Sequence, residues 1–304
     1  MTSSYLGVFG HTALDVILNV PKIPERDSSI AVESRVVRYG GTAANIARAA
    51  AEMCVDVSLA SFVGEDFPED YLHALKESGV STYDLKKMEG YKTPTCWIIN
   101  DSAGEQITII DQGVMSHTKN FELETRTIDE CEFLHIGTGQ PGYYEKIFES
   151  IDLSQKTIAF DPAQELGYVY EAEIFENFLQ KSDYFFCNEK EMNVALDYLN
   201  EKEPENLLKY VDLVLVTRGS KGSAIYLPEE RVDIPAYEPS KMVEPTGAGD
   251  AFRAGFYAGL YRDMSLIECC KIGSVRASFS VESSGPQDNL ASWEEVIERY
   301  NEFN

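Results

Sequence analysis

The clearest pattern in the chain is an alternation, from about Cys131 onward, of short apolar runs with longer amphipathic stretches. The runs are rich in β-branched and aromatic residues, and segments such as 172–181 and 190–200 between them carry apolar residues at helical spacing. This alternation is typical of β-α-β units around a mostly parallel sheet with helices on both faces. The runs are FLHIG, TIAFD, YFFCN, LVLVT and SAIYL.

The first half of the chain has a different pattern, in which apolar and polar positions alternate over LDVILNV, SIAVESRVV and TCWIINDSAGEQITII. Such alternation favours half-buried antiparallel strands, and the polar segment from Asn100 to Gly104 predicts a hairpin between residues 95 and 110. There is no linker-like tract or internal repeat. We therefore expect a single domain over residues 1–304, with a small β-sheet lid drawn from about 12–38 and 92–113.

The amino-acid composition limits the classes of molecule that the protein is expected to bind. The 304 residues include 51 acidic and 26 basic side chains, giving a formal charge of −25, which argues against binding to nucleic acid or anionic membranes. A small anion such as ATP stays compatible, because backbone dipoles and Mg²⁺ can reverse the field inside one cleft. No apolar run is long enough to span a bilayer and the N-terminus lacks a secretory signal, so we expect a cytoplasmic protein. The cysteines and histidines are too scattered to indicate a transition-metal site.

The strongest local signal is PTGAGDAFRAGF, residues 245–256, where a short extended segment runs into a helix. The backbone N–H groups of Gly247, Ala248 and Gly249 can approach an anion closely, and the start of the helix adds its positive end. Asp250 in the first turn could then take a proton from a hydroxyl directed at the same anion. A glycine-containing turn with an ordinary first-turn charge is the alternative.

Paired glycines also precede a helix of small residues in YGGTAANIARAAA, residues 39–51. Gly40 and Gly41 would let backbone approach a ligand, while Asn45 offers a donor and an acceptor to a diol. Asp15 could accept hydrogen bonds from the same hydroxyls. The alternative is a helix packed tightly on the sheet, with Asp15 in an exposed turn.

Two further segments suit the phosphate side of a nucleotide site. In CNEKE, Asn188 and Glu191 could organise a hydrated Mg²⁺, or could simply form a helix-capping box. In VTRGSKGS, residues 216–223, a strand ends in a glycine-bearing turn that could pass beneath a nucleotide, although a plain β-turn explains it too.

Taken together and in this order, YGGTAAN, NEKE, VTRGSKG and PTGAGDAF resemble the ribokinase-like (PfkB-type) carbohydrate kinase family, over nearly the whole chain. Within that family, FGHTALDVILNVPKIPE, LHIGTGQP, FDPAQEL and SFSVESSGPQDNLASWEEVIERY are similar to the archaeal broad-specificity nucleoside kinases. The resemblance implies a three-layer α/β/α sandwich with a mostly parallel central sheet, a β-sheet lid that commonly contributes to a homodimer, and transfer of phosphate from ATP·Mg²⁺ to a primary hydroxyl.

The resemblance also implies a role for each site residue. Asp250 would be the general base, with Gly247, Ala248 and Gly249 as the anion hole. The residues that would hold the ribose hydroxyls are Asp15, Gly40, Gly41 and Asn45. Those that would bind ATP are Asn188, Thr217, Gly219, Gly222 and Asn289. Glu191 would hold Mg²⁺ through water. Glu244 followed by Pro245 stands where many relatives carry Asp, so a monovalent cation is allowed rather than required.

The acceptor is expected to be uncharged, because the lid segments offer few cations for a substrate phosphate. Those cations are Arg26, Arg35, Arg38 and Lys92. Tyr39, Trp97 and Ile109 could face a nucleobase, or could be core residues. We predict a nucleoside kinase first. A ribokinase or 6-phosphofructokinase type of enzyme is the alternative, and a nucleoside sensor without catalytic activity is the alternative from another class.

Overall fold

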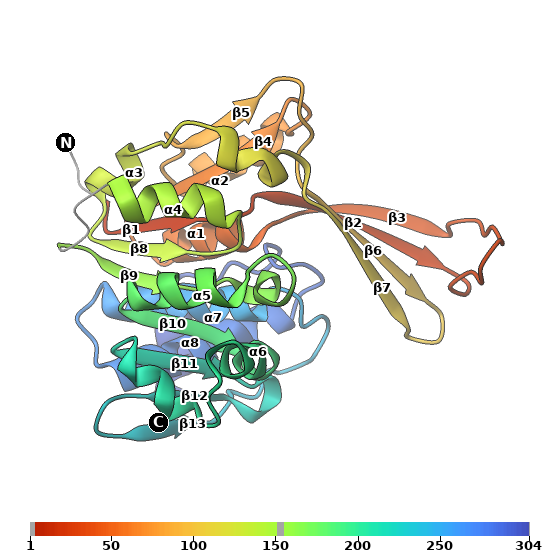
Figure 1. The fold of residues 1–304 in the computed structure, drawn as a ribbon. Helices are drawn as coiled ribbons and strands as arrows, with labels where there is room; N and C mark the ends of the chain where they lie inside the picture. Colours follow the sequence, from red (N-terminus) through yellow and green to blue (C-terminus); the bar gives the residue numbers. More distant parts are fainter. Residues whose placement is uncertain (1–3, 151–154, 304) are drawn as a thin grey trace.

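A nine-stranded sheet forms the body of the molecule in the computed structural model, which describes residues 4–150 and 155–303 (Figure 1). The strand order is β13-β12-β11-β10-β9-β8-β1-β4-β5, and all neighbours are parallel except the antiparallel pairs β11–β12 and β12–β13. Its strands are β1 (Leu6–Phe9), β4 (Val57–Gly64), β5 (Leu85–Met88), β8 (Phe133–Ile136), β9 (Thr157–Phe160), β10 (Tyr184–Asn188), β11 (Leu213–Thr217), β12 (Ser223–Tyr226) and β13 (Arg231–Ile234).

Successive side chains of the central strands enter two different cores. In β11, Leu213 and Leu215 join one buried cluster, while Val214 and Val216 join the other, because neighbouring side chains of a strand point to opposite faces. Both faces are therefore apolar and must be covered.

Helices cover both faces. One face carries α1 (Thr42–Glu52), α2 (Glu69–Glu77), α7 (Ala248–Leu260), α8 (Leu266–Val281) and α9 (Trp293–Phe303). The other carries α3 (Arg126–Glu130), α4 (Pro141–Ser150), α5 (Ala172–Gln180) and α6 (Glu189–Leu199). The predicted three-layer α/β/α sandwich with a mostly parallel sheet is confirmed. Short 3₁₀ segments connect the elements: η1 (Gly113–Asn120), η2 (Ala163–Gly167), η3 (Pro204–Lys209) and η4 (Gly219–Lys221).

A second sheet of four strands projects from one side of the body (Figure 1). Its order is β3-β2-β6-β7, made of β2 (Ala13–Val20), β3 (Ser34–Gly40), β6 (Thr95–Asp101) and β7 (Gln106–Asp111). The hairpin between 95 and 110 forms as the alternation predicts. The central pair β2–β6 is parallel rather than antiparallel, because the chain passes through β3, α1, β4, α2 and β5 between these two strands and returns to the small sheet in the same direction.

The small sheet is unusual in leaving apolar side chains in solvent. Every residue of β7 is exposed, and Ile109 is 54% exposed. Residues 29–32, which the pattern predicts as strand, lie outside β3 and are exposed. Among the described residues, no helix combines the length and the apolar character needed to cross a bilayer.

Candidate active site

Two adjoining cavities lie where the carboxyl ends of β1, β8, β9, β10 and β11 meet. The larger cavity, of about 270 Å³, lies at the base of the small sheet, and the smaller cavity, of about 160 Å³, reaches toward β10 and β11. Ligands of open parallel sheets bind outside the carboxyl ends of the strands, which makes this edge the expected location. Both cavities are lined by Thr42, Gln164, Gly249 and Asp250.

The turn that begins α7 supplies backbone N–H groups between the cavities. Gly247 is the N-cap residue with φ of 80°, and a side chain there would run into Pro286. The N–H of Ala248 donates to the carbonyl of Pro245 at 3.2 Å. Within the described residues, the N–H groups of Gly249 and Asp250 have no acceptor, so these two remain available to an anion at the positive end of the helix.

Asp250 is half-buried at the junction of the cavities. Desolvation raises the pKa of its carboxyl to about 7, and a hydrogen bond from Asn45 acts in the opposite direction. The Nδ2 atom of Asn45 donates to Oδ2 of Asp250 at 2.8 Å. A carboxylate with a pKa near neutrality is well matched to general base catalysis.

The paired glycines bring the base of the small sheet close to β1. Gly41 is the N-cap of α1 with φ of 94°, and a Cβ atom there would lie 2.5 Å from the His11 carbonyl oxygen. A Cβ atom on Gly40 would fall on the carboxylate of Asp15. Asp15 is only 8% exposed, and burial raises its pKa to about 6. Asp15, Gly41 and Asn45 line the larger cavity together.

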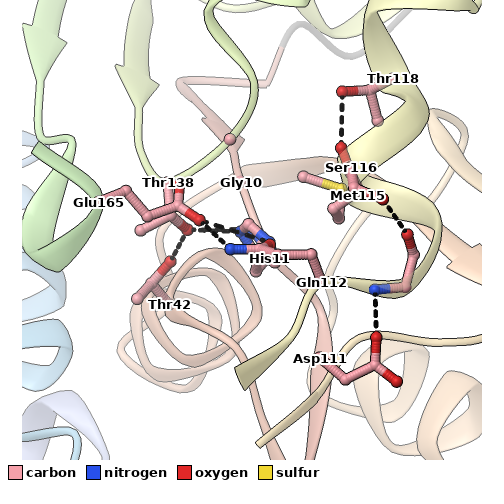
Figure 2. A network of polar contacts seen from close by, with 12 residues as sticks. Gly10, His11, Thr42, Asp111, Gln112, Met115, Ser116, Thr118, Thr138 and Glu165 are labelled. Atoms are coloured by element: carbon pink, nitrogen blue, oxygen red, sulfur yellow. Dashed lines mark hydrogen bonds and ion pairs between the residues drawn. The ribbon is translucent and has the colours of Figure 1, made fainter. Parts of the chain in front are cut away.

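A polar network in the wall of the larger cavity was missed by the sequence reasoning (Figure 2). Nδ1 of His11 lies 2.8 Å from Oγ1 of Thr138, and Nε2 of His11 contacts Oε1 of Gln112. Gln112 in turn donates to Oε1 of Glu165 at 2.6 Å, while Thr42 contacts Thr138 at 2.7 Å. The available signal was the polar residue that follows each buried strand, here His11 after β1 and Thr138 after β8.

The smaller cavity contains a capping box. Oδ1 of Asn188 accepts from the N–H groups of Lys190 and Glu191, and Oε2 of Glu191 accepts from the N–H of Asn188 at 2.7 Å. The capping alternative for CNEKE is therefore present. Both side chains nevertheless line the smaller cavity, and desolvation raises the pKa of Glu191.

A buried ion pair lies beside this box. Nε of Arg253 donates to Oδ2 of Asp161 at 2.7 Å, while Oδ1 of Asp161 has no hydrogen-bond partner among the described residues. In the described part of the chain, no group of three or more His, Cys, Asp or Glu side chains forms a metal cage. Mg²⁺ in phosphoryl-transfer sites keeps several waters and needs only one or two carboxylates, so Asp161 and Glu191 suit it.

Of the remaining residues predicted to bind ATP, one lines a cavity and three do not. Thr217, at the end of β11, lines the smaller cavity. Gly219 and Gly222 line neither cavity, and a side chain on Gly222 would collide with the Ile234 carbonyl, so Gly222 shapes the turn into β12. Asn289 also lies outside both cavities and donates to the carbonyl of Phe279 at 2.8 Å, which attaches the C-terminal segment to α8.

Comparison with known proteins agrees with this geometry. The model of the pfkB family of carbohydrate kinases matches residues 3–293. A nucleoside kinase of Methanocaldococcus jannaschii is 38% identical over 95% of this chain and 94% of its own, and one of Methanothermobacter thermautotrophicus is 32% identical over 96% and 94%. The crystal structure of the M. jannaschii protein, described as an archaeal member of the ribokinase family, superposes with a TM-score of 0.92 at 36% identity and covers 99% of this chain and 100% of that one.

Proposed function

Since the chain belongs to the pfkB family of carbohydrate kinases, we propose that its acceptor is the 5′-hydroxyl of a nucleoside and that Asp250 is the general base. The chain is an ATP-dependent phosphotransferase that acts on an alcohol group, as its family and its relatives show. Relatives named nucleoside kinase at 38% and 32% identity support the choice of acceptor.

The observation that carries the proposal is the position of Asp250 between the two cavities. Asp250 and Gly249 line both, so a hydroxyl in the larger cavity and a phosphate in the smaller one would meet at the same carboxylate and the same N–H groups. Phosphoryl transfer depends mainly on such alignment and on neutralising the charge of the moving group.

The walls of the larger cavity favour an uncharged acceptor. The described residues that line it include Asp15, Asp111 and Glu165 but no Lys or Arg. Of the cations considered for a substrate phosphate, Arg38 pairs with Asp288 at 3.1 Å and Lys92 with Glu65 at 3.1 Å. A sugar phosphate would meet repulsion here, whereas ribose hydroxyls and base N–H groups would find acceptors.

In the proposed mechanism, Asp15 and Asn45 hold the ribose hydroxyls and direct the 5′-oxygen toward the γ-phosphate. Asp250 removes the hydroxyl proton as the 5′-oxygen bonds to the γ-phosphorus, while the bond from that phosphorus to the β–γ bridging oxygen breaks and ADP leaves. The N–H groups of Gly249 and Asp250 then face the charge that develops on the transferred group. We also propose that the small sheet acts as a lid, which would exclude water and limit ATP hydrolysis.

Asp161, Asn188 and Glu191 would hold Mg²⁺ on the donor side, largely through water. The unpartnered Oδ1 of Asp161 supports this assignment. When bound, Mg²⁺ would offset negative charge on the ATP phosphates and help to orient them.

A panel assay tests the acceptor. ADP release is measured with several nucleosides, ribose and fructose 6-phosphate, and the product is identified by ³¹P NMR. We expect turnover with nucleosides and 5′-phosphorylated products. Preferential turnover of ribose or fructose 6-phosphate would replace the proposal with a sugar kinase, and turnover with none of them would favour a nucleoside sensor.

We further propose a homodimer formed through the small sheet. Its exposed apolar side chains support this, because monomers seldom leave such a group in water. They are Val36, Val37, Trp97, Ile107, Ile109 and Ile110. Light scattering should give twice the chain mass for the wild type and a monomer for Ile109→Lys, whereas Tyr168→Lys, an exposed aromatic residue outside this sheet, should stay dimeric. A monomeric wild type would contradict the proposal.

A further inference from the structure

A chain of hydrogen bonds runs from a cation on α1 to the carboxylate of Asp250. Nη1 of Arg48 donates to Oε1 of Gln287 at 3.0 Å, and Nε2 of Gln287 donates to Oδ1 of Asn45 at 2.7 Å. Nδ2 of Asn45 then donates to Oδ2 of Asp250 at 2.8 Å. Gln287 and Asn45 are buried, at 8% and 7% exposure, so water competes little for these bonds.

The direction of every bond in this chain follows from its two ends. The guanidinium of Arg48 can only donate, so the amide of Gln287 must turn its oxygen toward Arg48 and its NH₂ group toward Asn45. An ionised Asp250 can only accept, so Asn45 must turn its NH₂ group toward Asp250 and its oxygen toward Gln287. Both ends require the same orientation of both amides, and the NH₂ group facing Asp250 is thereby fixed.

The chain is anchored on both sides. Nε of Arg48 donates to Oγ of Ser78 at 3.1 Å, and Ser78 donates to Glu52 at 2.6 Å, which holds the guanidinium in place. Gln287 follows Pro286, the residue packed against Gly247 in the turn before Asp250. The loop after α8 therefore contacts the catalytic turn and also supplies the central amide.

A branch reaches the base of the small sheet. The second N–H of Gln287 goes to the hydroxyl of Tyr71 at 2.7 Å, and that hydroxyl donates to the carbonyl of Gly40 at 2.8 Å. The ring of Tyr71 stacks on Tyr39 with centroids 4.1 Å apart. Gln287 thus uses both of its donors, one toward the catalytic carboxylate and one toward the end of β3.

We propose that Gln287 is a positioning residue, oriented by Arg48, that fixes the amide of Asn45 as a donor to Asp250 and so stabilises the ionised base. This inference rests on the proposed role of Asp250 as general base. The hydrogen bond from Asn45 opposes the rise that burial causes in the pKa of Asp250, which agrees with this direction. Losing the fixed donor should therefore raise that pKa and hinder proton removal.

Two substitutions of Gln287 distinguish the effect of losing its amide from the effect of adding a charge. Gln287→Glu keeps an acceptor for Arg48 but turns a second oxygen toward Asn45. Asn45 would then donate to residue 287 and present its own oxygen, in place of its NH₂ group, to Asp250. Gln287→Met removes the amide at similar volume and adds no charge. Asp288→Asn is the matched control in the same loop, since it weakens the Arg38 ion pair and leaves the chain of bonds intact.

The measurements are kcat and KM for the nucleoside across pH, with thermal unfolding to verify folding. We expect kcat to fall about tenfold in both Gln287 variants, the acid limb of kcat to move up by about one pH unit, and ATP KM to change little. Wild-type kcat and acid limb in a folded Gln287→Met would overturn the proposal. So would an equal shift in Asp288→Asn, because the effect would then belong to the loop.

A titration that needs no turnover keeps this inference distinct from the proposed function. The ¹³C carboxyl resonance of Asp250, assigned by its loss in Asp250→Asn, reports its pKa directly. A higher pKa in Gln287→Met supports the positioning role even if nucleosides prove not to be the acceptor, and an unchanged pKa contradicts it even if they are. Absence of nucleoside turnover by the wild type would instead overturn the function alone.

Discussion

The two cavities that meet at Asp250 are built differently. The larger one is walled by polar side chains from distant segments of the chain, and His11, Asn45 and Glu165 among them are buried and hydrogen-bonded. The smaller one is walled mainly by a capped helix start and by the Asp161–Arg253 pair. The first arrangement fixes donors and acceptors before a ligand arrives, while the second offers charges and backbone that suit any nucleoside triphosphate. Acceptor choice should therefore depend on many residues, and ATP binding on few.

The largest effect is expected from Gly41→Ala on the side of the larger cavity. The new Cβ atom would meet the backbone of His11 at a φ of 94°, so the connection between β3 and α1 must shift. We expect a loss of kcat/KM of at least about 10² and lower thermal stability. Gly219→Ala is the control outside both cavities, because its φ of 58° is also positive but nothing lies within 4 Å of its Cβ position, so it isolates backbone strain from the collision. Equal losses in both variants would assign the effect to backbone strain and not to the larger cavity.

Asp15→Asn should have the next largest effect. The variant keeps the shape of a buried residue but loses its charge. If Asp15 accepts from the ribose hydroxyls, as proposed, nucleoside KM should rise about tenfold or more while ATP KM stays within about twofold. Initial-rate kinetics with each substrate varied in turn would measure both. Asp111→Asn, which lies exposed at the rim of the same cavity, should give a smaller rise.

Glu191→Gln should act on the opposite substrate. If Glu191 helps to hold ATP·Mg²⁺, as proposed, loss of its carboxylate should raise the KM for ATP·Mg²⁺ several-fold and leave nucleoside KM unchanged. Glu268→Gln alters the corresponding capping box of α8, formed with Ser265 away from both cavities, and controls for helix stability. Gln at this position can still accept from the N–H of the N-cap residue, so both variants should keep nearly the wild-type melting temperature, and only Glu191→Gln should affect the KM for ATP.

The smallest effect concerns stability against pH. The pKa of Asp250 is about 7 in the folded chain and about 4 when unfolded, so between these values the folded state keeps a proton that the unfolded state releases. Stability from this group is therefore present at pH 4 and lost as pH rises through 7. Asp250→Asn should match the wild type at pH 4 and be more stable at pH 8, by about 1–3 kcal/mol after allowance for partial exposure. A less stable variant at pH 8 would contradict the raised pKa.

Much of the fold could be predicted because its signals are local. The five apolar runs from FLHIG to SAIYL coincide with strands β8 to β12, and the helical spacing over 172–181 and 190–200 coincides with α5 and α6. Strand pairing was less accessible. The parallel β2–β6 pair joins segments about eighty positions apart, and neither segment contains a sign of its direction.

The geometry of the candidate site could be predicted where one short segment determines it, as in the turn from Gly247 to Asp250, whereas the roles of its residues stay predictions. Prediction failed where residues come together over long distances. The contacts of His11 with Thr138 and Gln112 join segments more than 100 residues apart, and no spacing indicates them. Sequence also cannot distinguish a residue that shapes the backbone from one that faces a ligand, because a turn glycine or a capping amide looks the same in both cases. This applies to Gly219, Gly222 and Asn289.

The most direct test of the central claim is a rapid-quench single turnover, in which enzyme with bound ATP·Mg²⁺ is mixed with a nucleoside and labelled nucleoside 5′-phosphate is followed. With Asp250 as the base, Asp250→Asn should bind ATP with unchanged Kd and transfer phosphate at least about 10² more slowly than the wild type. Transfer by Asp250→Asn at the wild-type rate would show that the proton leaves by another route and would contradict the account.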